Sequence, residues 1–158
     1  MDEDASSYRV SIWDFERGQM NLRCRSEEFS DMDIKALVLL PTVERPHALE
    51  NREYHRKFTR TLHDSITIRF ATVEEQAIKF WECESGILKT VKKLNVKQSL
   101  IDAVSSDMIG FIIVLGRNGA VLILNSEGKY VSTIERADVQ FTSVAVSNEN
   151  LFLGTFSG

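Results

Sequence analysis

The segment 44–64 holds residue types that could carry chemistry. All three histidines of the chain, His47, His55 and His63, lie in it. Imidazole is a common zinc ligand, but these histidines are eight residues apart. A helical zinc site needs two histidines four residues apart, and no cysteine is close in the sequence. Metal binding is therefore the least favoured interpretation of this segment, and the sequence predicts neither a metal nor a cofactor.

The same segment also carries a basic and aromatic cluster. Its cationic residues are Arg52, Arg56, Lys57 and Arg60. Tyr54, Phe58 and Leu62 recur every four residues, which is typical of one face of a short helix. Three interpretations stay open, in decreasing order of preference: a solvated surface loop, a docking element for a protein partner, and a binder of an acidic surface, such as a microtubule or nucleic acid, through residues 52–60.

Two other groups of residues invite a ligand interpretation. The stretch from Gly116 to Gly119, with the sequence Gly-Arg-Asn-Gly, suggests phosphate binding. However, Asn-Gly between two apolar runs is typical of a hairpin turn that needs a positive φ angle. The acidic residues of the connector 25–33 are Glu27, Glu28, Asp31 and Asp33. Their spacing matches no calcium loop, so a solvated connector is favoured over a cation site.

Catalytic motifs are absent from the sequence. It contains no glycine-rich phosphate loop, no Gly-x-Ser-x-Gly elbow, no His-Glu-x-x-His motif and no closely spaced cysteines. The two cysteines, Cys24 and Cys83, are far apart in the sequence, and reduced buried thiols are favoured over a disulfide or a metal ligand. We therefore predict that the protein is not an enzyme and has no small-molecule substrate.

Composition and charge limit the class of protein. The chain has 158 residues, of which 43% are hydrophobic and 27% charged, as in a globular domain with a real core. A net charge of -4 gives no general attraction to nucleic acid or to an anionic membrane. No apolar run approaches the roughly 18 residues that span a bilayer, and the tail 1–7 is acidic where a leader would be basic. We expect a cytoplasmic location, with association to the cytoskeleton or a nuclear location as alternatives.

Short strand-like runs follow one another along the chain, and their pattern repeats. Each repeated run ends near a large apolar residue and is followed by a turn containing glycine. The apolar positions in register are Trp13, Trp81 and Leu124, and the turn glycines are Gly18, Gly86 and Gly128. Two further strand-like runs, rich in β-branched and aromatic residues, precede the second and third copies. Each unit is therefore predicted to have four strands.

The spacing of these units is that of a propeller blade. The interval from Trp81 to Leu124 falls within the period of about 40 to 45 residues expected for four-stranded blades. The interval from Trp13 to Trp81 is longer because the charged segment 44–64 is inserted between the first and second strands of its unit. The insertion is thus expected to project from one face of the disc.

On these motifs the chain resembles the WD-repeat β-propellers. The matching stretches are Trp13-Asp14, Phe80-Trp81-Glu82 and residues 153–158, which look like the family's turn between second and third strands. The Gly-His pair that precedes the first strand of a blade in the family is missing. A more distant likeness is to large eukaryotic WD-repeat scaffolds of the mitogen-activated kinase-binding or ciliary and centriolar type. It rests on Leu151-Phe152-Leu153-Gly154 after Ala145-Val146-Ser147.

The predicted fold is all-β: an incomplete β-propeller of four-stranded antiparallel blades, with two full blades and two half blades. The expected parts are an acidic tail (1–7), the outer strands of a first partial blade (8–24), an acidic connector (25–33), a second blade (34–91), a third blade (100–134) and the inner strands of a fourth partial blade (141–158). Because propellers close with about 4 to 8 blades, we expect a longer protein or other chains to complete the ring. A two-sheet sandwich is the alternative.

The resemblance and the strand pattern together imply a rigid scaffold for protein–protein interaction, in which the partners are other proteins and the rest of the propeller. The candidate contact residues are Lys97, Gln98, Arg117 and Asn118 on one face, and Arg52, Tyr54, Arg56 and Lys57 on the other. The residues expected to maintain the repeat are Trp13, Asp14, Trp81, Leu124 and Gly119. The alternative function is binding of an acidic surface, a microtubule or nucleic acid, through the basic insertion 52–60, although the net charge disfavours nucleic acid.

Overall fold

The computed structural model of the 158-residue chain describes residues 9–16, 18–26, 33–40, 67–84, 86–106, 110–148 and 150–156. The tail 1–7, the insertion 44–64 and most of the connector 25–33 lie outside these residues. The predictions made for those segments therefore stay predictions.

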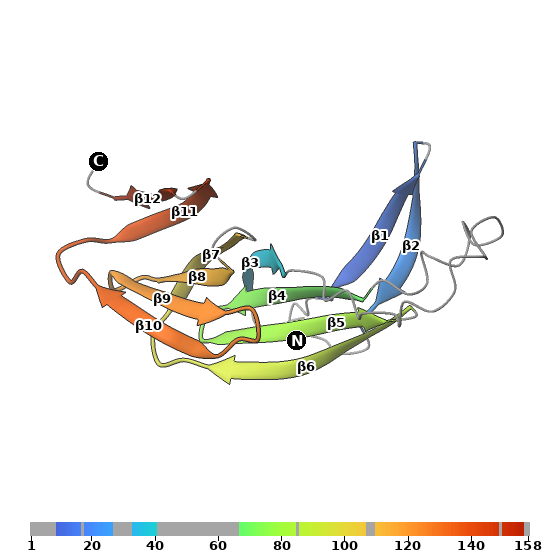
Figure 1. Ribbon diagram of the computed structural model, residues 1–158, viewed down its shortest axis with the longest axis horizontal. Helices are drawn as coiled ribbons and strands as arrows, with labels where there is room; N and C mark the ends of the chain where they lie inside the picture. Colours follow the sequence, from blue (N-terminus) through green and yellow to red (C-terminus); the bar gives the residue numbers. More distant parts are fainter. Residues whose placement is uncertain are drawn as a thin grey trace, which may run out of the picture.

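The described regular elements are β-strands, arranged in four antiparallel sheets (Figure 1). The first hairpin consists of β1 (Ser11–Glu16) and β2 (Gln19–Arg25). The first sheet has the order β3 (Ile34–Leu39), β4 (Ile68–Glu74), β5 (Ala77–Glu84) and β6 (Ile87–Asn95). The second sheet consists of β7 (Leu100–Ser106), β8 (Phe111–Gly116), β9 (Ala120–Asn125) and β10 (Tyr130–Glu135). The last hairpin consists of β11 (Phe141–Ser147) and β12 (Asn150–Thr155).

For the described residues, the coarse prediction of an all-β fold with four-stranded antiparallel sheets is confirmed. In each four-stranded sheet, strands adjacent in sequence are adjacent in space. None of the sheets formed by the described residues closes on itself. In that same part of the chain, no helix is long and apolar enough to cross a membrane.

The position of a strand in the assembly explains its sequence. β8 and β9 are almost continuous apolar runs, because sheets or hairpins cover both faces of the second sheet. β6 lies at the edge of the first sheet and alternates instead: Leu88 is buried, whereas Ile87 and Lys89 on either side of it are exposed. This alternation is the pattern expected of a strand with one covered face.

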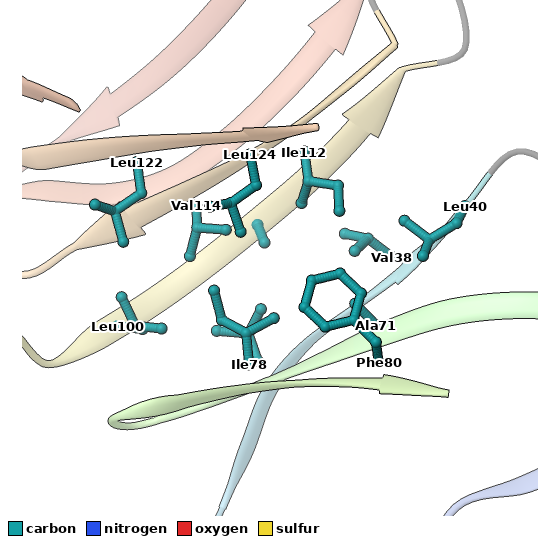
Figure 2. Packing of buried hydrophobic residues seen from close by; sticks show 12 residues of the cluster. Val38, Leu40, Ala71, Ile78, Phe80, Leu100, Ile112, Val114, Leu122 and Leu124 are labelled. Carbon is teal, nitrogen blue, oxygen red and sulfur yellow. The ribbon is translucent and has the colours of Figure 1, made fainter. Parts of the chain in front are cut away.

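The described residues form three hydrophobic cores, which lie in series between the four sheets. The core between the first hairpin and the first sheet contains Val10, Cys24, Phe70, Trp81, Cys83 and Leu88. The central core joins the first and second sheets (Figure 2) and includes Ile78, Phe80, Leu100, Ile112, Val114 and Leu124. The core against the last hairpin contains Ile113, Leu115, Val121 and Phe141. Four sheets stacked in chain order differ from a two-sheet sandwich, which has a single core.

The first strands of successive units lie next to one another. β3 packs against β7, and β7 packs against β11, although each belongs to a different sheet. The Ser105 hydroxyl donates a hydrogen bond to the carbonyl oxygen of Leu39. The backbone N–H of Val144 donates to Asp102 Oδ2 over 2.8 Å. Hydrogen bonds between a side chain and a backbone group therefore join these strands, which share no backbone ladder in the described part of the chain.

Asp102→Ala should weaken the attachment of the last hairpin. The substitution leaves the partly buried N–H of Val144 without its carboxylate acceptor, so we expect a loss of about 1–2 kcal/mol in the free energy of unfolding. Urea denaturation measures the loss, and hydrogen exchange should show faster exchange at the Val144 amide. Asp102→Asn is the intermediate variant: the second carboxylate oxygen accepts from the Ala103 N–H, and asparagine keeps only one of the two acceptor oxygens. Unchanged exchange at Val144 in the alanine variant would contradict the assignment.

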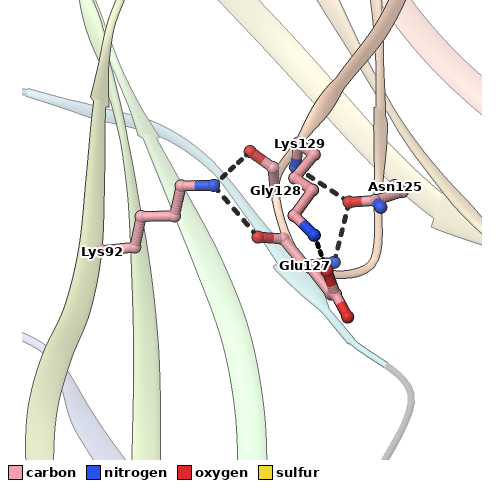
Figure 3. Close-up of polar contacts among 5 residues, drawn as sticks. All are labelled: Lys92, Asn125, Glu127, Gly128 and Lys129. Atoms are coloured by element: carbon pink, nitrogen blue, oxygen red, sulfur yellow. Dashed lines mark hydrogen bonds and ion pairs between the residues drawn. The ribbon is translucent and has the colours of Figure 1, made fainter.

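A turn of the second sheet rests on the outer strand of the first sheet. Lys92, in β6, donates hydrogen bonds to the carbonyl oxygens of Gly128 (2.6 Å) and Glu127 (3.2 Å), as Figure 3 shows. The side-chain oxygen of Asn125 accepts from the N–H groups of Glu127 and Lys129 and fixes the shape of the turn. These bonds hold the two sheets together at the edge opposite β3 and β7.

Candidate functional site

A shallow hollow lies where the β6–β7 connector meets the β8–β9 turn. Its volume is about 490 Å³, and its lining residues are Lys97, Gln98, Ser99, Arg117 and Asn118. Lys97 and Gln98 come from the connector, whereas Arg117 and Asn118 come from the turn. The structure thus brings together the four contact residues predicted for this face, and adds Ser99 to them.

The connector is held to the first sheet by backbone hydrogen bonds. The N–H of Val96 donates to the carbonyl oxygen of Gln76 over 3.0 Å, and the N–H of Leu100 donates to that of Glu75 over 2.7 Å. The Ser99 hydroxyl also donates to Glu75 Oε1 over 3.2 Å. Both ends of the connector are therefore fixed to the β4–β5 turn, which limits the movement of Lys97 and Gln98.

The β8–β9 turn is fixed in the same way. The N–H of Arg117 donates to the carbonyl oxygen of Ser99 over 2.8 Å, which ties the turn to the connector. Gly119 closes the turn with φ +80°, in the left-handed region that favours glycine, and its carbonyl oxygen accepts from the N–H of Arg136 over 2.9 Å. The Gly-Arg-Asn-Gly stretch is thus a hairpin turn between β8 and β9, as expected from Asn-Gly.

The lining of the hollow is polar and carries positive charge. Lys97 and Arg117 are exposed and contribute two cations, while Asn118 and the half-buried Gln98 contribute amides that donate and accept hydrogen bonds. The Glu75 carboxylate, which is part of the connector's hydrogen-bond network, accepts a hydrogen bond from the Ser99 hydroxyl. Such a lining suits carboxylate groups, because Arg can bind a carboxylate with two parallel hydrogen bonds and Lys adds a point charge.

The remaining predicted contact residues are not part of this surface. Arg52, Tyr54, Arg56 and Lys57 lie in the insertion, outside the described residues. The acidic connector is described only in part: Asp33 pairs with Lys35 over 2.9 Å at the surface. Within the stretches that the structure describes, no group of three or more His, Cys, Asp or Glu side chains could hold a metal ion.

The large apolar residues expected to maintain the repeat differ in burial. Trp81 and Leu124 are buried, 3% and 0% exposed. The Trp81 indole Nε1 donates to Thr72 Oγ1 over 2.8 Å, and its ring stacks on Phe70. By contrast, Trp13 is 47% exposed. It pairs with Leu22 on the face of the hairpin opposite to Ile12, which packs into the core, so it lies away from the first sheet.

Asp14 lies at the surface of the first hairpin. Its carboxylate is 3.5 Å from the Arg23 guanidinium, and the side chain is 54% exposed. A pair of this kind contributes little to stability, because water screens it. The Trp-Asp motif of the first unit is therefore more exposed than its counterpart Trp81-Glu82, in which Glu82 pairs with Arg69 over 3.7 Å.

Two features of the structure were not predicted from the sequence. Cys24 and Cys83 lie side by side between the first hairpin and the first sheet, with 2.9 Å between their sulfur atoms. Burial raises the pKa of the Cys24 thiol to about 12, and the Cys83 sulfur adds to the shift. In addition, the buried Glu74 pairs with Lys79 over 2.7 Å across β4 and β5. Spacing along the chain offered no signal for the cysteine pair, because the contact joins two sheets.

Two comparisons of the sequence with known proteins identify no relative. A scan against protein-family models finds no match, and a search of curated proteins finds no similar sequence. The function is therefore inferred from the residues and their arrangement.

Proposed function

We propose that this chain is part of a WD-repeat-like β-propeller and acts as a rigid, non-enzymatic scaffold. Its partner is a protein that presents an acidic segment to the hollow lined by Lys97, Gln98, Ser99, Arg117 and Asn118. The rest of the propeller, from the same protein or from another chain, is the second partner. A cytoplasmic location, with the cytoskeleton or nucleus as alternatives, belongs to the same proposal.

Repeated local geometry supports the propeller. The turn glycines of the three units, Gly18, Gly86 and Gly128, all have positive φ angles between 69° and 79°. The strand register also shifts immediately before both tryptophans, between Ile12 and Trp13 and between Phe80 and Trp81. A β-bulge at the same place in two units indicates one repeated structural unit, because bulges re-aim side chains and do not arise from general strand propensity.

Exposed apolar side chains on the first and last hairpins, at the two ends of the stack of sheets, support the proposal that the propeller is incomplete. Trp13, Met20 and Leu22 of the first hairpin are 47%, 65% and 45% exposed. Phe152 of the last hairpin is 57% exposed. In the middle of the stack, sheets cover the equivalent faces. Stacked units bury such faces against their neighbours, so further blades are expected at both ends.

The observation that carries the interaction role is the rigid attachment of the hollow. The hollow is formed by two segments, the β6–β7 connector between the two four-stranded sheets and the β8–β9 turn of the second sheet. The hydrogen bond from the Arg117 N–H to the Ser99 carbonyl oxygen joins them. Both segments are anchored to further turns at Glu75, Gln76 and Arg136. Lys97 and Arg117 are therefore presented on a fixed frame, which lowers the entropy cost of ordering them on binding.

Binding of an acidic peptide tests this role. We expect a fluorescein-labelled hexaglutamate peptide to bind the wild-type protein at low salt, measured by fluorescence anisotropy. The double variant Lys97→Glu with Arg117→Glu should weaken binding at least about tenfold, because the attraction of two cations becomes repulsion. Added salt should weaken wild-type binding as well.

The control is a double charge reversal on the outer strand β6, Lys89→Glu with Lys93→Glu. Both side chains are exposed, and the change in net charge is the same. This variant should bind the peptide within about twofold of the wild type. Equal weakening by the two double variants, or no binding of the peptide to the wild type, would contradict the proposal.

The alternative, an acidic surface bound by the insertion 52–60, concerns residues outside the described part of the chain. It stays a prediction from the sequence.

A further inference from the structure

The two cysteines of the chain meet at the junction of the first hairpin and the first sheet. Cys24 lies in β2 and Cys83 in β5, and their sulfur atoms are 2.9 Å apart. They are 5% and 2% exposed and belong to the same hydrophobic core, with Phe70, Trp81 and Leu88 around them. A disulfide bond is about 2.05 Å long. The sulfur atoms would have to approach by less than about 1 Å to form one.

A covalent bond at this place would change how the hairpin is attached. β1 and β2 pair with each other, and no described strand of the first sheet continues their ladder. The contact between the hairpin and the sheet is the side-chain core that contains both cysteines. Elements attached without a backbone ladder open more easily than strands within a sheet. A bond between β2 and β5 would therefore act on the junction that depends on side-chain packing.

We propose that Cys24 and Cys83 are a redox modification site, at which a reversible disulfide fastens the first hairpin to the first sheet. The oxidant is a small-molecule disulfide of the glutathione type. One protein thiolate attacks it, forms a mixed disulfide and releases one glutathione thiol. The other cysteine then attacks the sulfur of the first, and the second glutathione leaves. Two protein S–H bonds are replaced by one S–S bond, and the two electrons and two protons appear in two glutathione thiols.

The surroundings of the pair make this reaction slow in the closed state. The sulfur atoms are buried, and a raised pKa keeps the Cys24 thiol protonated at neutral pH, whereas the thiolate is the reactive form. Exchange is therefore expected when the hairpin opens, and once formed the disulfide is shielded from reductant. In a reducing compartment the two cysteines stay as thiols, and in an oxidising compartment they form the disulfide.

The test uses the full wild-type chain in glutathione buffers of varying ratio. Because the chain has only two cysteines, an internal disulfide joins Cys24 to Cys83, and intact mass and free-thiol titration report it. The same chain in denaturant is the reference. Since the fold holds the sulfur atoms together, the equilibrium constant for disulfide formation should be roughly 30- to 1,000-fold larger in the native protein. Oxidation should raise Tm by about 5–15 °C and slow amide exchange in β1 and β2.

Cys24→Ala and Cys83→Ala are the matched controls. Each should form only a mixed disulfide with glutathione, and neither should gain in Tm on oxidation. The proposal is overturned if both thiols of the native wild type stay free at ratios that oxidise the denatured chain. It is equally overturned if oxidation yields only glutathione adducts or disulfide-linked dimers.

Discussion

Trp81→Ala is expected to lower the free energy of unfolding by about 3–5 kcal/mol, measured by chemical denaturation. The indole is 3% exposed and stacks on Phe70, with 6.1 Å between ring centroids and 9° between the planes. Its removal leaves a large cavity between the first hairpin and the first sheet. It also removes the hydrogen bond to Thr72, whose hydroxyl is fully buried. An unsatisfied buried hydroxyl adds to the cost of the cavity.

Trp13→Ala is the matched control, because Trp13 occupies the same place in the repeated sequence pattern. Its side chain is 47% exposed and faces away from the first sheet. The expected loss is about 1 kcal/mol or less, since little buried surface disappears. A third variant, Trp81→Phe, keeps an aromatic ring beside Phe70 and should cost less than Trp81→Ala. Equal losses of unfolding free energy in Trp81→Ala and Trp13→Ala would contradict the burial of Trp81 between the first hairpin and the first sheet.

Gly119→Ala is expected to cost about 3 kcal/mol or more. The residue has φ +80°, where alanine is strained, and a methyl group would collide with the carbonyl oxygens of Arg136 and Val139. Both obstacles are backbone atoms of the β10–β11 connector, so relief requires that connector to move away. The bond from the Arg136 N–H to the Gly119 carbonyl oxygen would be disturbed as well. Thermal or urea denaturation measures the loss.

Gly18→Ala separates the two causes. Gly18 has φ +78°, but a methyl group there would meet no atom within 4 Å. This variant carries only the conformational cost, about 1–2 kcal/mol. The difference in unfolding free energy between the two variants measures the cost of the collision with the carbonyl oxygens of Arg136 and Val139. Equal losses of stability in both variants would contradict the close packing of the β10–β11 connector on the β8–β9 turn. Gly119→Ala should also weaken hexaglutamate binding, because the turn that presents Arg117 is displaced.

The strands and turns were largely predictable from the sequence because their causes are local. Apolar runs, their alternation and the glycines of the turns indicated two four-stranded antiparallel sheets, and the structure contains them. The same counting of strands placed Lys97 and Gln98 in a connector and Arg117 and Asn118 in a turn. These residues line one hollow because the connector leading into β7 and the turn leaving β8 lie at the same end of the second sheet, where Leu100 pairs with Gly116.

Other features could not be predicted because they depend on how the sheets stack. The repeat pattern predicted the same role for Trp13 and Trp81, yet of these two residues only Trp81 is buried between the first hairpin and the first sheet. Cys24 and Cys83 are 59 residues apart in the sequence, and only packing of the hairpin on the sheet brings their sulfur atoms together. The bond from Val144 to Asp102 likewise joins strands of different sheets.

By itself, then, the sequence determined the type of secondary structure, the grouping of strands and the polar character of the exposed turns. These properties follow from residues a few positions apart, through side-chain alternation and backbone preference. The tertiary structure alone decided which apolar faces are covered and which buried groups meet, the two cysteine sulfur atoms among them. Those outcomes depend on contacts between sheets, and the free energy of such contacts comes from burying faces that no short stretch of sequence can pair.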